Sequence, residues 1–203
     1  MNVEIKISEE LIPFKEAIER LENRVKNIKS GNANDLIWIL EHPKTYTAGL
    51  RSNNKEILDK SIKITNTNRG GKITLHNPGQ KIVYLAIDLN KRKKDIRNLV
   101  RNIENSIIEF LHRYNIESKA DKQNIGIWVK EKKIAAIGFR VTKWIAYHGC
   151  SINIQNNLND YKKIIPCGLD NSKITSMKNE GIIKFEEINS DLVEIFRNNL
   201  TKL

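Results

Sequence analysis

The apolar residues of this chain recur in two periods, which predict helices near its beginning, middle and end and strands between them. Ser8 is suited to a helix N-cap, and Gly31 ends the repeat that follows it. In between, apolar side chains return every three or four positions, as in an amphipathic helix: Leu11, Phe14, Ile18, Leu21, Val25 and Ile28. Pro13 fits only the first turn of such a helix. A second stripe predicts a helix that buries Ile96, Val100, Ile103, Ile107, Phe110, Leu111 and Tyr114, and a third is expected from about Ser190, burying Leu192, Ile195 and Phe196.

Runs rich in β-branched and aromatic residues, bounded by glycine, proline and asparagine, predict the strands. Single strands are expected at 36–40, 62–67, 72–76 and 81–89, with a loop at 42–49. Three further runs, GIWV, KIAAIGFRV and WIAYHGCSINI, follow between 125 and 154 and indicate an antiparallel meander. Because side chains alternate along a strand, His148 and Cys150 are expected on one face and Tyr147 and Gly149 on the other. Helices separated by runs of strands favour an α+β fold.

Length and charge narrow the possibilities. The 203 residues suit one domain with its own core. A formal net charge of +11 suggests an acidic partner, such as nucleic acid or an anionic membrane. Lysine, asparagine and isoleucine are all abundant, however, as a coding bias toward A and T produces, so a solvated basic surface explains the charge without either ligand. The basic run at 91–94 is also interpreted as a solvated surface before a helix, and contact with a carrier protein is the more specific alternative.

The cysteines and the lengths of the apolar segments indicate in which cellular compartment the protein is expected. Cys150 and Cys167 lie neither in a CxxC pair nor near spaced histidines, so no metal site is predicted. The first twenty residues alternate charged with apolar side chains, unlike a secretory signal, and no window holds the roughly 20 apolar residues of a membrane helix. We therefore expect a reducing, cytoplasmic setting without a disulfide between the two cysteines.

The segment RGGKITLHNPGQ, residues 69–80, carries the strongest sign of a site. Gly70 and Gly71 allow positive φ and close approach to a ligand, while Arg69 and His76 supply a fixed cation and a titratable ring. A glycine hairpin would explain this segment alone. Two other segments also indicate chemistry: KKIAAIGFR (132–140) places lysine before a strand of small residues, and IIPCGL (164–169) places Cys167 between proline and glycine.

Together these segments resemble the lipoate-pathway octanoyltransferases, which move an octanoyl group from acyl carrier protein to a lysine of lipoyl domains. The resemblance keeps the family's order and spacing through LEHPKTYTAG (40–49), RGGKITLHNPGQ, GIWV, KIAAIGFRV, YHG, PCG and ITSM (174–177). It implies one α+β catalytic domain over residues 1–203, similar to the lipoate and biotin protein ligase catalytic fold, with mixed or antiparallel sheets flanked by helices. It also implies no cofactor, octanoyl-acyl carrier protein as donor, and lipoyl domains of 2-oxoacid dehydrogenase complexes or glycine cleavage H protein as acceptors.

The resemblance also assigns roles by position. Cys167 matches the family's acyl-accepting cysteine and Lys133 its lysine, although on sequence alone Lys133 reads as a surface turn residue. A free thiol, with a pKa of ~8.5, is only slightly ionised at neutral pH. A lysine can lower that pKa as a cation or, when neutral, take the proton. The family's substrate contacts fall on Arg69, Gly70, Gly71, Lys72, Ile73, Thr74, Leu75, His76, Ala136, Ile137, Gly138, Gly149, Cys150 and Ser151.

These residues are expected to line an acyl tunnel, in which the small residues Ala136 and Gly138 leave space and Ile73 and Leu75 form apolar wall. His76 and His148 are expected to orient the site or satisfy buried backbone groups, without a role in proton transfer. Backbone N–H groups around Gly70, Gly71 and Gly149 are all candidates for stabilising the thioester oxygen.

The chain departs from the family's usual TYHGPGQ at two positions. Leu75 replaces an aromatic residue and is expected to alter the width of the tunnel. Asn77 replaces a glycine, and asparagine tolerates the left-handed backbone of a turn better than most residues. Reaction type is therefore better determined than acyl-chain length.

Two other functions stay open on the sequence. A lipoate–protein ligase shares the RGG-and-histidine segment and the lysine motif, but it activates free acid with ATP and would not need Cys167. A basic nucleic-acid-binding module would use the net charge together with Trp38, Trp128 and Trp144. These tryptophans lie in predicted strands and are expected in the core or a pocket wall.

Overall fold

A mixed seven-stranded sheet forms the middle layer of the protein in the computed structural model, which describes residues 2–121, 123–166 and 173–203. Its strand order is β1-β2-β6-β10-β9-β8-β7. In this sheet β1 pairs with β2 in parallel, and the other neighbouring strands pair antiparallel. The strands are β1 (Val3–Leu11), β2 (Asp35–Glu41), β6 (Gln80–Asp88), β7 (Lys119–Ala120), β8 (Ile127–Val129), β9 (Lys132–Thr142) and β10 (Ile145–Asn153). The predicted antiparallel meander is confirmed as β8, β9 and β10.

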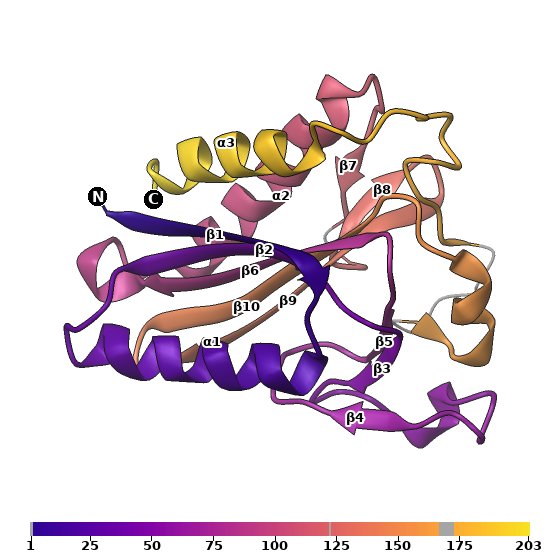
Figure 1. The fold of residues 1–203 in the computed structure, drawn as a ribbon, viewed down its shortest axis with the longest axis horizontal. Coiled ribbons are helices and arrows are strands. Elements are labelled where there is room, and N and C mark those ends of the chain that lie inside the picture. The colour runs from indigo at the N-terminus through magenta and orange to yellow at the C-terminus, as the bar shows by residue number, and fades with distance from the viewer. Residues whose placement is uncertain (1, 122, 167–172) are drawn as a thin grey trace.

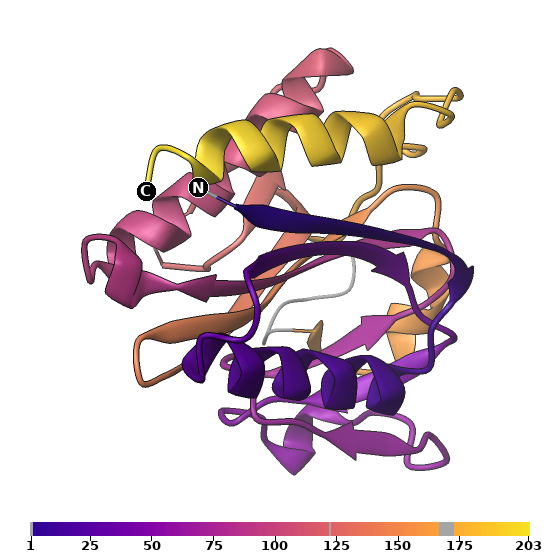
Figure 2. The same cartoon turned by 60° about the vertical axis from the view of Figure 1, so that its left-hand side comes forward.

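Helices cover both faces of this sheet, so that the molecule has three layers (Figure 1). Helices α2 (Ile96–Arg113) and α3 (Ile188–Leu200) lie together on one face, where their apolar stripes pack on the sheet. Helix α1 (Phe14–Lys29) lies across the other face (Figure 2). Most of each predicted helical stripe is confirmed, since Leu21, Ile107 and Phe196 are each fully buried. Two positions were wrong, because Leu11 lies in β1 and Ile96, the first residue of α2, is 39 % exposed. No helix in the described part of the chain is both long and apolar enough to span a bilayer.

A second, three-stranded sheet lies beside α1 and carries part of the site (Figure 1). Its order is β4-β3-β5, with β3 (Thr45–Ala48), β4 (Ile64–Asn66) and β5 (Ile73–His76). A small apolar core joins it to the 3-10 helix η3 (Leu158–Lys163) through Leu75, Tyr161 and Ile164. The 3-10 turn η1 (Asn54–Glu56) lies between β3 and β4, and η2 (Leu89–Lys91) lies between β6 and α2. Two sheets flanked by helices bear out the α+β prediction.

Two sequence expectations were wrong at the beginning of the chain. Ser8 does not cap a helix, because it lies within β1 and its hydroxyl accepts a hydrogen bond from Trp38 Nε1 at 2.9 Å. The helix begins later, at Phe14, with Pro13 at the N-cap. The segment 42–49 is not all loop either, since β3 lies within it and pairs with both β4 and β5. In both cases pairing with strands distant in sequence decides the conformation, which local periodicity does not report.

Candidate active site

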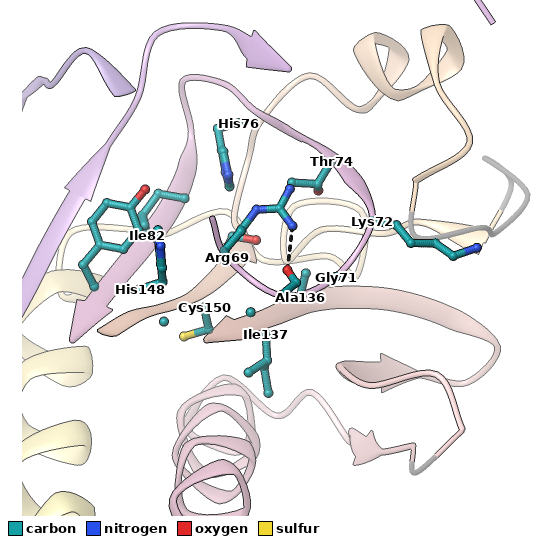
Figure 3. Close-up of a pocket in the computed structure, with 15 residues that line it drawn as sticks. Arg69, Gly71, Lys72, Thr74, His76, Ile82, Ala136, Ile137, His148 and Cys150 are labelled. Carbon is teal, nitrogen blue, oxygen red and sulfur yellow. Dashed lines mark hydrogen bonds between the residues drawn. The ribbon is translucent and has the colours of Figure 1, made fainter. Parts of the chain in front are cut away.

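A cavity lies where β5, the loop at 69–72 and the paired strands β9 and β10 meet (Figure 3). Most of the sequence-predicted substrate contacts line it: Arg69, Gly70, Gly71, Lys72, Thr74, His76, Ala136, Ile137, Gly138, Gly149, Cys150 and Ser151. Three lining residues were not among those expected contacts, namely Ile82, Tyr84 and His148. Ile82 and Tyr84 come from β6, whose apolar pattern reads only as core, so the sequence carried no signal for them.

Ile73 and Leu75 do not line this cavity, contrary to the expected tunnel wall. Side chains alternate along β5, so Thr74 and His76 face the cavity while Ile73 and Leu75 face the small core against Tyr161. Leu75 is fully buried there. Its replacement of an aromatic residue therefore changes the packing of the small core, and the expected effect on tunnel width was wrong.

Glycines let three stretches of backbone stack directly at the site. The Gly70 amide donates to Phe139 O on β9 at 3.1 Å, and a Cβ on Gly138 would lie 3.2 Å from Gly70 O. On the other side of the loop, a Cβ on Gly49 would lie 2.5 Å from Gly71 O, closer than real side chains come. Gly71 itself has a φ of 90°, which favours glycine. The loop is thus packed closely between β9 and the end of β3.

Arg69 ties this loop to the small sheet. Its Nη2 donates to Thr47 O at 3.0 Å and to Thr47 Oγ1 at 2.8 Å, and its Nη1 donates to Gly70 O at 3.0 Å. The guanidinium lies over the cavity close to Thr74 and His76 (Figure 3). A fixed positive charge therefore faces the space that a substrate would occupy.

Amide side chains determine which nitrogen of each cavity histidine carries the proton. Gln80 Nε2 donates to Asn153 Oδ1 at 2.9 Å, so its Oε1 accepts from His76 Nδ1 at 2.7 Å. Asn68 Nδ2 donates to Glu22 Oε1 at 2.9 Å, so its Oδ1 accepts from His148 Nε2 at 2.7 Å. Burial lowers the pKa of both histidines to about 3, with Arg69 adding to the effect. Both rings are therefore neutral at pH 7, each with one nitrogen left to accept a hydrogen bond.

His148 and Cys150 do not share a face of β10, which corrects the simple alternation. His148 has a φ of 70°, and its ring stacks on Tyr147 at 4.9 Å. Both rings reach Asn68, whereas Cys150 packs into the apolar core on the α2 and α3 side. Positive φ is costly for a residue other than glycine, so the Asn68 contact and the stacking together hold a strained backbone beside the cavity.

The buried histidines make stability depend on pH. His42, like His76 and His148, is buried, which lowers its pKa to about 4. Unfolded histidine has a pKa of ~6.5, so between that pH and the folded pKa the unfolded chain binds protons that the folded chain does not. We expect stability to be level above about pH 6.5 and to fall below it, by up to about 1.4 kcal/mol per pH unit for each histidine.

Urea unfolding midpoints at pH 7.5 and 5.5 measure this effect. His42→Gln should lessen the pH dependence, whereas His112→Gln, at an exposed position on α2, should leave it intact. Equal midpoints at the two pH values would contradict the assignment of neutral buried histidines.

Lys133 is buried, which corrects its reading as a surface turn residue. Its side chain is 6 % exposed, and Nζ donates to Ile125 O at 2.7 Å and lies 5.6 Å from the centre of the Trp128 ring. Gly126 makes the space for it, because a Cβ there would lie 2.3 Å from Lys133 Cε. Lys132, the preceding residue, is exposed, because successive side chains of a strand point to opposite faces.

A second cavity connects Lys133 with the first. Its lining includes Lys133, Tyr161 and Pro166, and it shares Thr74, Ala136 and Ser151 with the cavity of Figure 3. The two cavities therefore adjoin at these three residues, with Lys133 and Pro166 lining one and Ile82 and Tyr84 lining the other. Cys167, the residue after Pro166, lies outside the described residues.

The other cysteine is unsuited to nucleophilic attack. Burial raises the pKa of the Cys150 thiol far above its usual value, which leaves it protonated at neutral pH. Among the described residues no three His, Cys, Asp or Glu side chains are grouped so as to hold a metal ion. The chemistry available at this site is therefore that of a buried ammonium, a guanidinium, neutral histidines and backbone amides beside a largely apolar cavity.

Comparison with known proteins identifies the family and the fold of this chain. The family model of the lipoyl protein ligase A/B catalytic domain matches residues 14–197. An octanoyltransferase of Wolbachia pipientis is 42 % identical over 181 residues, covering 87 % of this chain and 88 % of the relative. One of Bartonella tribocorum is 41 % identical over 193 residues, covering 88 % and 79 %. The crystal structure of a lipoate-protein ligase A bound with ATP superposes with a TM-score of 0.76 at 13 % identity, covering 98 % of this chain and 86 % of the other, which bears out the predicted fold. The chain belongs to the lipoyl protein ligase A/B catalytic domain family, and it is an acyltransferase that transfers octanoyl groups in protein lipoylation.

Proposed function

We propose that the chain, as one catalytic domain, takes octanoyl from octanoyl-acyl carrier protein onto Cys167 and passes it to a lysine of a lipoyl domain. The acceptors would be lipoyl domains of 2-oxoacid dehydrogenase complexes or glycine cleavage H protein, and the reaction would take place in the cytoplasm. No ATP is required, because the donor already holds the acyl group as a thioester.

The observation that supports this proposal is the pair of adjoining cavities, taken as the two ends of one acyl site. One end has the Lys133 ammonium and Pro166, the neighbour of Cys167 in sequence. The other end has the side chains of Ile82 and Tyr84. An acyl chain needs this combination, a polar end for the reacting carbonyl and an apolar end for the alkyl tail.

In the first half-reaction the Cys167 thiolate attacks the donor carbonyl, and the bond from that carbonyl to the carrier sulfur breaks. The carrier thiolate leaves and takes up a proton. In the second half-reaction the neutral ε-amine of the acceptor attacks the enzyme thioester, an amide forms, and the Cys167 thiolate is released. Lys133 favours the thiolate as a cation and accepts a proton from the amine when neutral. Backbone N–H groups at the glycine-rich loop are candidates to stabilise the negative oxygen.

Transfer without ATP tests this function against the ligase alternative. We expect an octanoyl mass increment on a lipoyl domain from octanoyl-acyl carrier protein alone, with no transfer from free octanoate and ATP. A ligase would give the reverse result. Transfer from free octanoate that survives Cys167→Ala would establish the ligase and overturn the proposal.

A larger side chain at Ala136 is expected to block the passage of an acyl chain between the two cavities, because this residue lines both. Ala136→Leu should lower the rate of octanoyl transfer by about 10²-fold or more, since a misplaced substrate loses its reactive alignment. A two-carbon acyl donor should be affected much less. Val141→Leu, at a position of the same strand that lines neither cavity, serves as the control. Equal losses for long and short acyl groups would contradict an acyl site that extends through both cavities.

A further inference from the structure

The segment 50–63 between β3 and β4, together with Lys162 on η3, carries five basic residues, which we name the basic edge: Arg51, Lys55, Lys60, Lys63 and Lys162. All five are exposed. The same segment holds two exposed apolar residues, Leu50 at 68 % and Leu58 at 54 %. The charge comes from segments far apart in sequence, since Leu58 N donates to Lys163 O at 3.0 Å.

The acidic residues of this region are neutralised by lysines outside the basic edge. Glu56 pairs with Lys72 at 3.0 Å, and Asp59 pairs with Lys163 at 3.2 Å. Within the part of the chain that the structure describes, none of the five basic-edge residues forms an ion pair. Their positive charge therefore faces solvent and acts at long range.

The basic edge is continuous with the mouth of the site. Leu50 N donates to Arg69 O at 3.1 Å, and Arg51 N donates to Gly71 O at 3.0 Å, so this loop lies directly on the glycine-rich loop. Lys72 lines the cavity and its side chain points outward from it (Figure 3). On the other side, Ile165 N donates to Glu56 O at 2.7 Å, which brings the segment before Pro166 against the same surface.

We infer that the basic edge is the docking surface for the acyl donor, a small acidic carrier protein, with Leu50 and Leu58 as its apolar contacts. This inference rests on the proposed function. An acidic carrier matches the charge, and a carrier seated here would hold its thioester beside the mouth of the cavity. The alternative basic run at 91–94 lies farther from the cavity, because β6 continues past Tyr84 for four more residues, about 13 Å, before η2 leads into that run.

Charge reversal separates this surface from the net charge of the protein. In Lys55→Glu/Lys60→Glu/Lys63→Glu, KM for octanoyl-acyl carrier protein should rise about tenfold or more, with kcat nearly unchanged. With octanoyl-pantetheine, a small donor that lacks the acidic protein, kcat/KM should change less than about twofold. The control Lys93→Glu/Lys94→Glu/Arg97→Glu makes the same charge change at three exposed residues near the start of α2 and should leave KM for the carrier nearly unaltered.

Equal effects of the two triple variants would overturn the inference, as would a rise in KM for the lipoyl domain in place of the carrier. Thermal unfolding checks that both variants are folded, and if the first is not, Lys60→Glu alone should raise KM for the carrier about twofold. A wild-type protein that accepts octanoyl from neither donor would refute the proposed function, and the docking surface with it. If the wild type accepts octanoyl from octanoyl-pantetheine, and the Lys55→Glu/Lys60→Glu/Lys63→Glu variant shows no loss of activity with octanoyl-acyl carrier protein, only the docking surface is refuted.

Discussion

Replacing Cys167 with alanine is expected to lower octanoyl transfer by about 10³-fold or more and to abolish the covalent octanoyl adduct. The reason is chemical, because without the thiolate no thioester can form on the enzyme. Intact-mass measurement after incubation with octanoyl-acyl carrier protein shows the adduct, and peptide mapping locates it. Cys167→Ser should leave folding nearly intact while losing most of the activity.

Cys150 supplies the matched control. It lines the cavity, but its buried thiol is held protonated, so Cys150→Ala should keep both the adduct and most of the transfer activity. An octanoyl group mapped to Cys150, or full transferase activity in Cys167→Ala, would rule out the assignment.

Replacing Lys133 with methionine is expected to lower the rate of acyl-enzyme formation at neutral pH by about 10²–10⁴-fold. Methionine keeps the stem of the side chain in the space beside Gly126 and removes the ammonium that donates to Ile125 O. Without that cation the pKa of the Cys167 thiol should rise, so the pH profile of its alkylation by a small reagent should move upward. Raising the pH should restore part of the acylation rate.

Lys132→Met tests whether this effect is specific. Lys132 is adjacent in sequence but exposed, and it does not line either cavity, so its replacement should leave the alkylation profile unchanged. Equal shifts from the two lysines, or an unchanged profile in Lys133→Met, would remove Lys133 as the partner of Cys167 even if Cys167 remained the nucleophile. Circular dichroism of each variant separates lost activation from lost folding.

The period of the apolar residues was sufficient to predict the helices and most strands. The stripes that become α2 and α3 and the alternation through β8, β9 and β10 are strong local patterns, and most of the side chains that they indicate are buried, whereas Ile96 at the start of α2 is exposed. Strand β1 was misread because its apolar residues run into those of α1, and β3 because four residues carry too little pattern. Pairing with partners far away in sequence stabilises both strands.

The sequence by itself determined the α+β class, the glycine-rich loop, and the family to which the motifs point, because those motifs keep their order and spacing. The tertiary structure decided what the motifs enclose. It buried Lys133 in space that Gly126 leaves, turned His148 toward Asn68 through a positive φ, and removed Leu75 from the cavity to the small core. These outcomes depend on contacts between segments tens of residues apart, such as Asn68 with His148 and Gly49 with Gly71. Local pattern reports the conformation of a segment, whereas the close packing of different segments determines where each side chain has room.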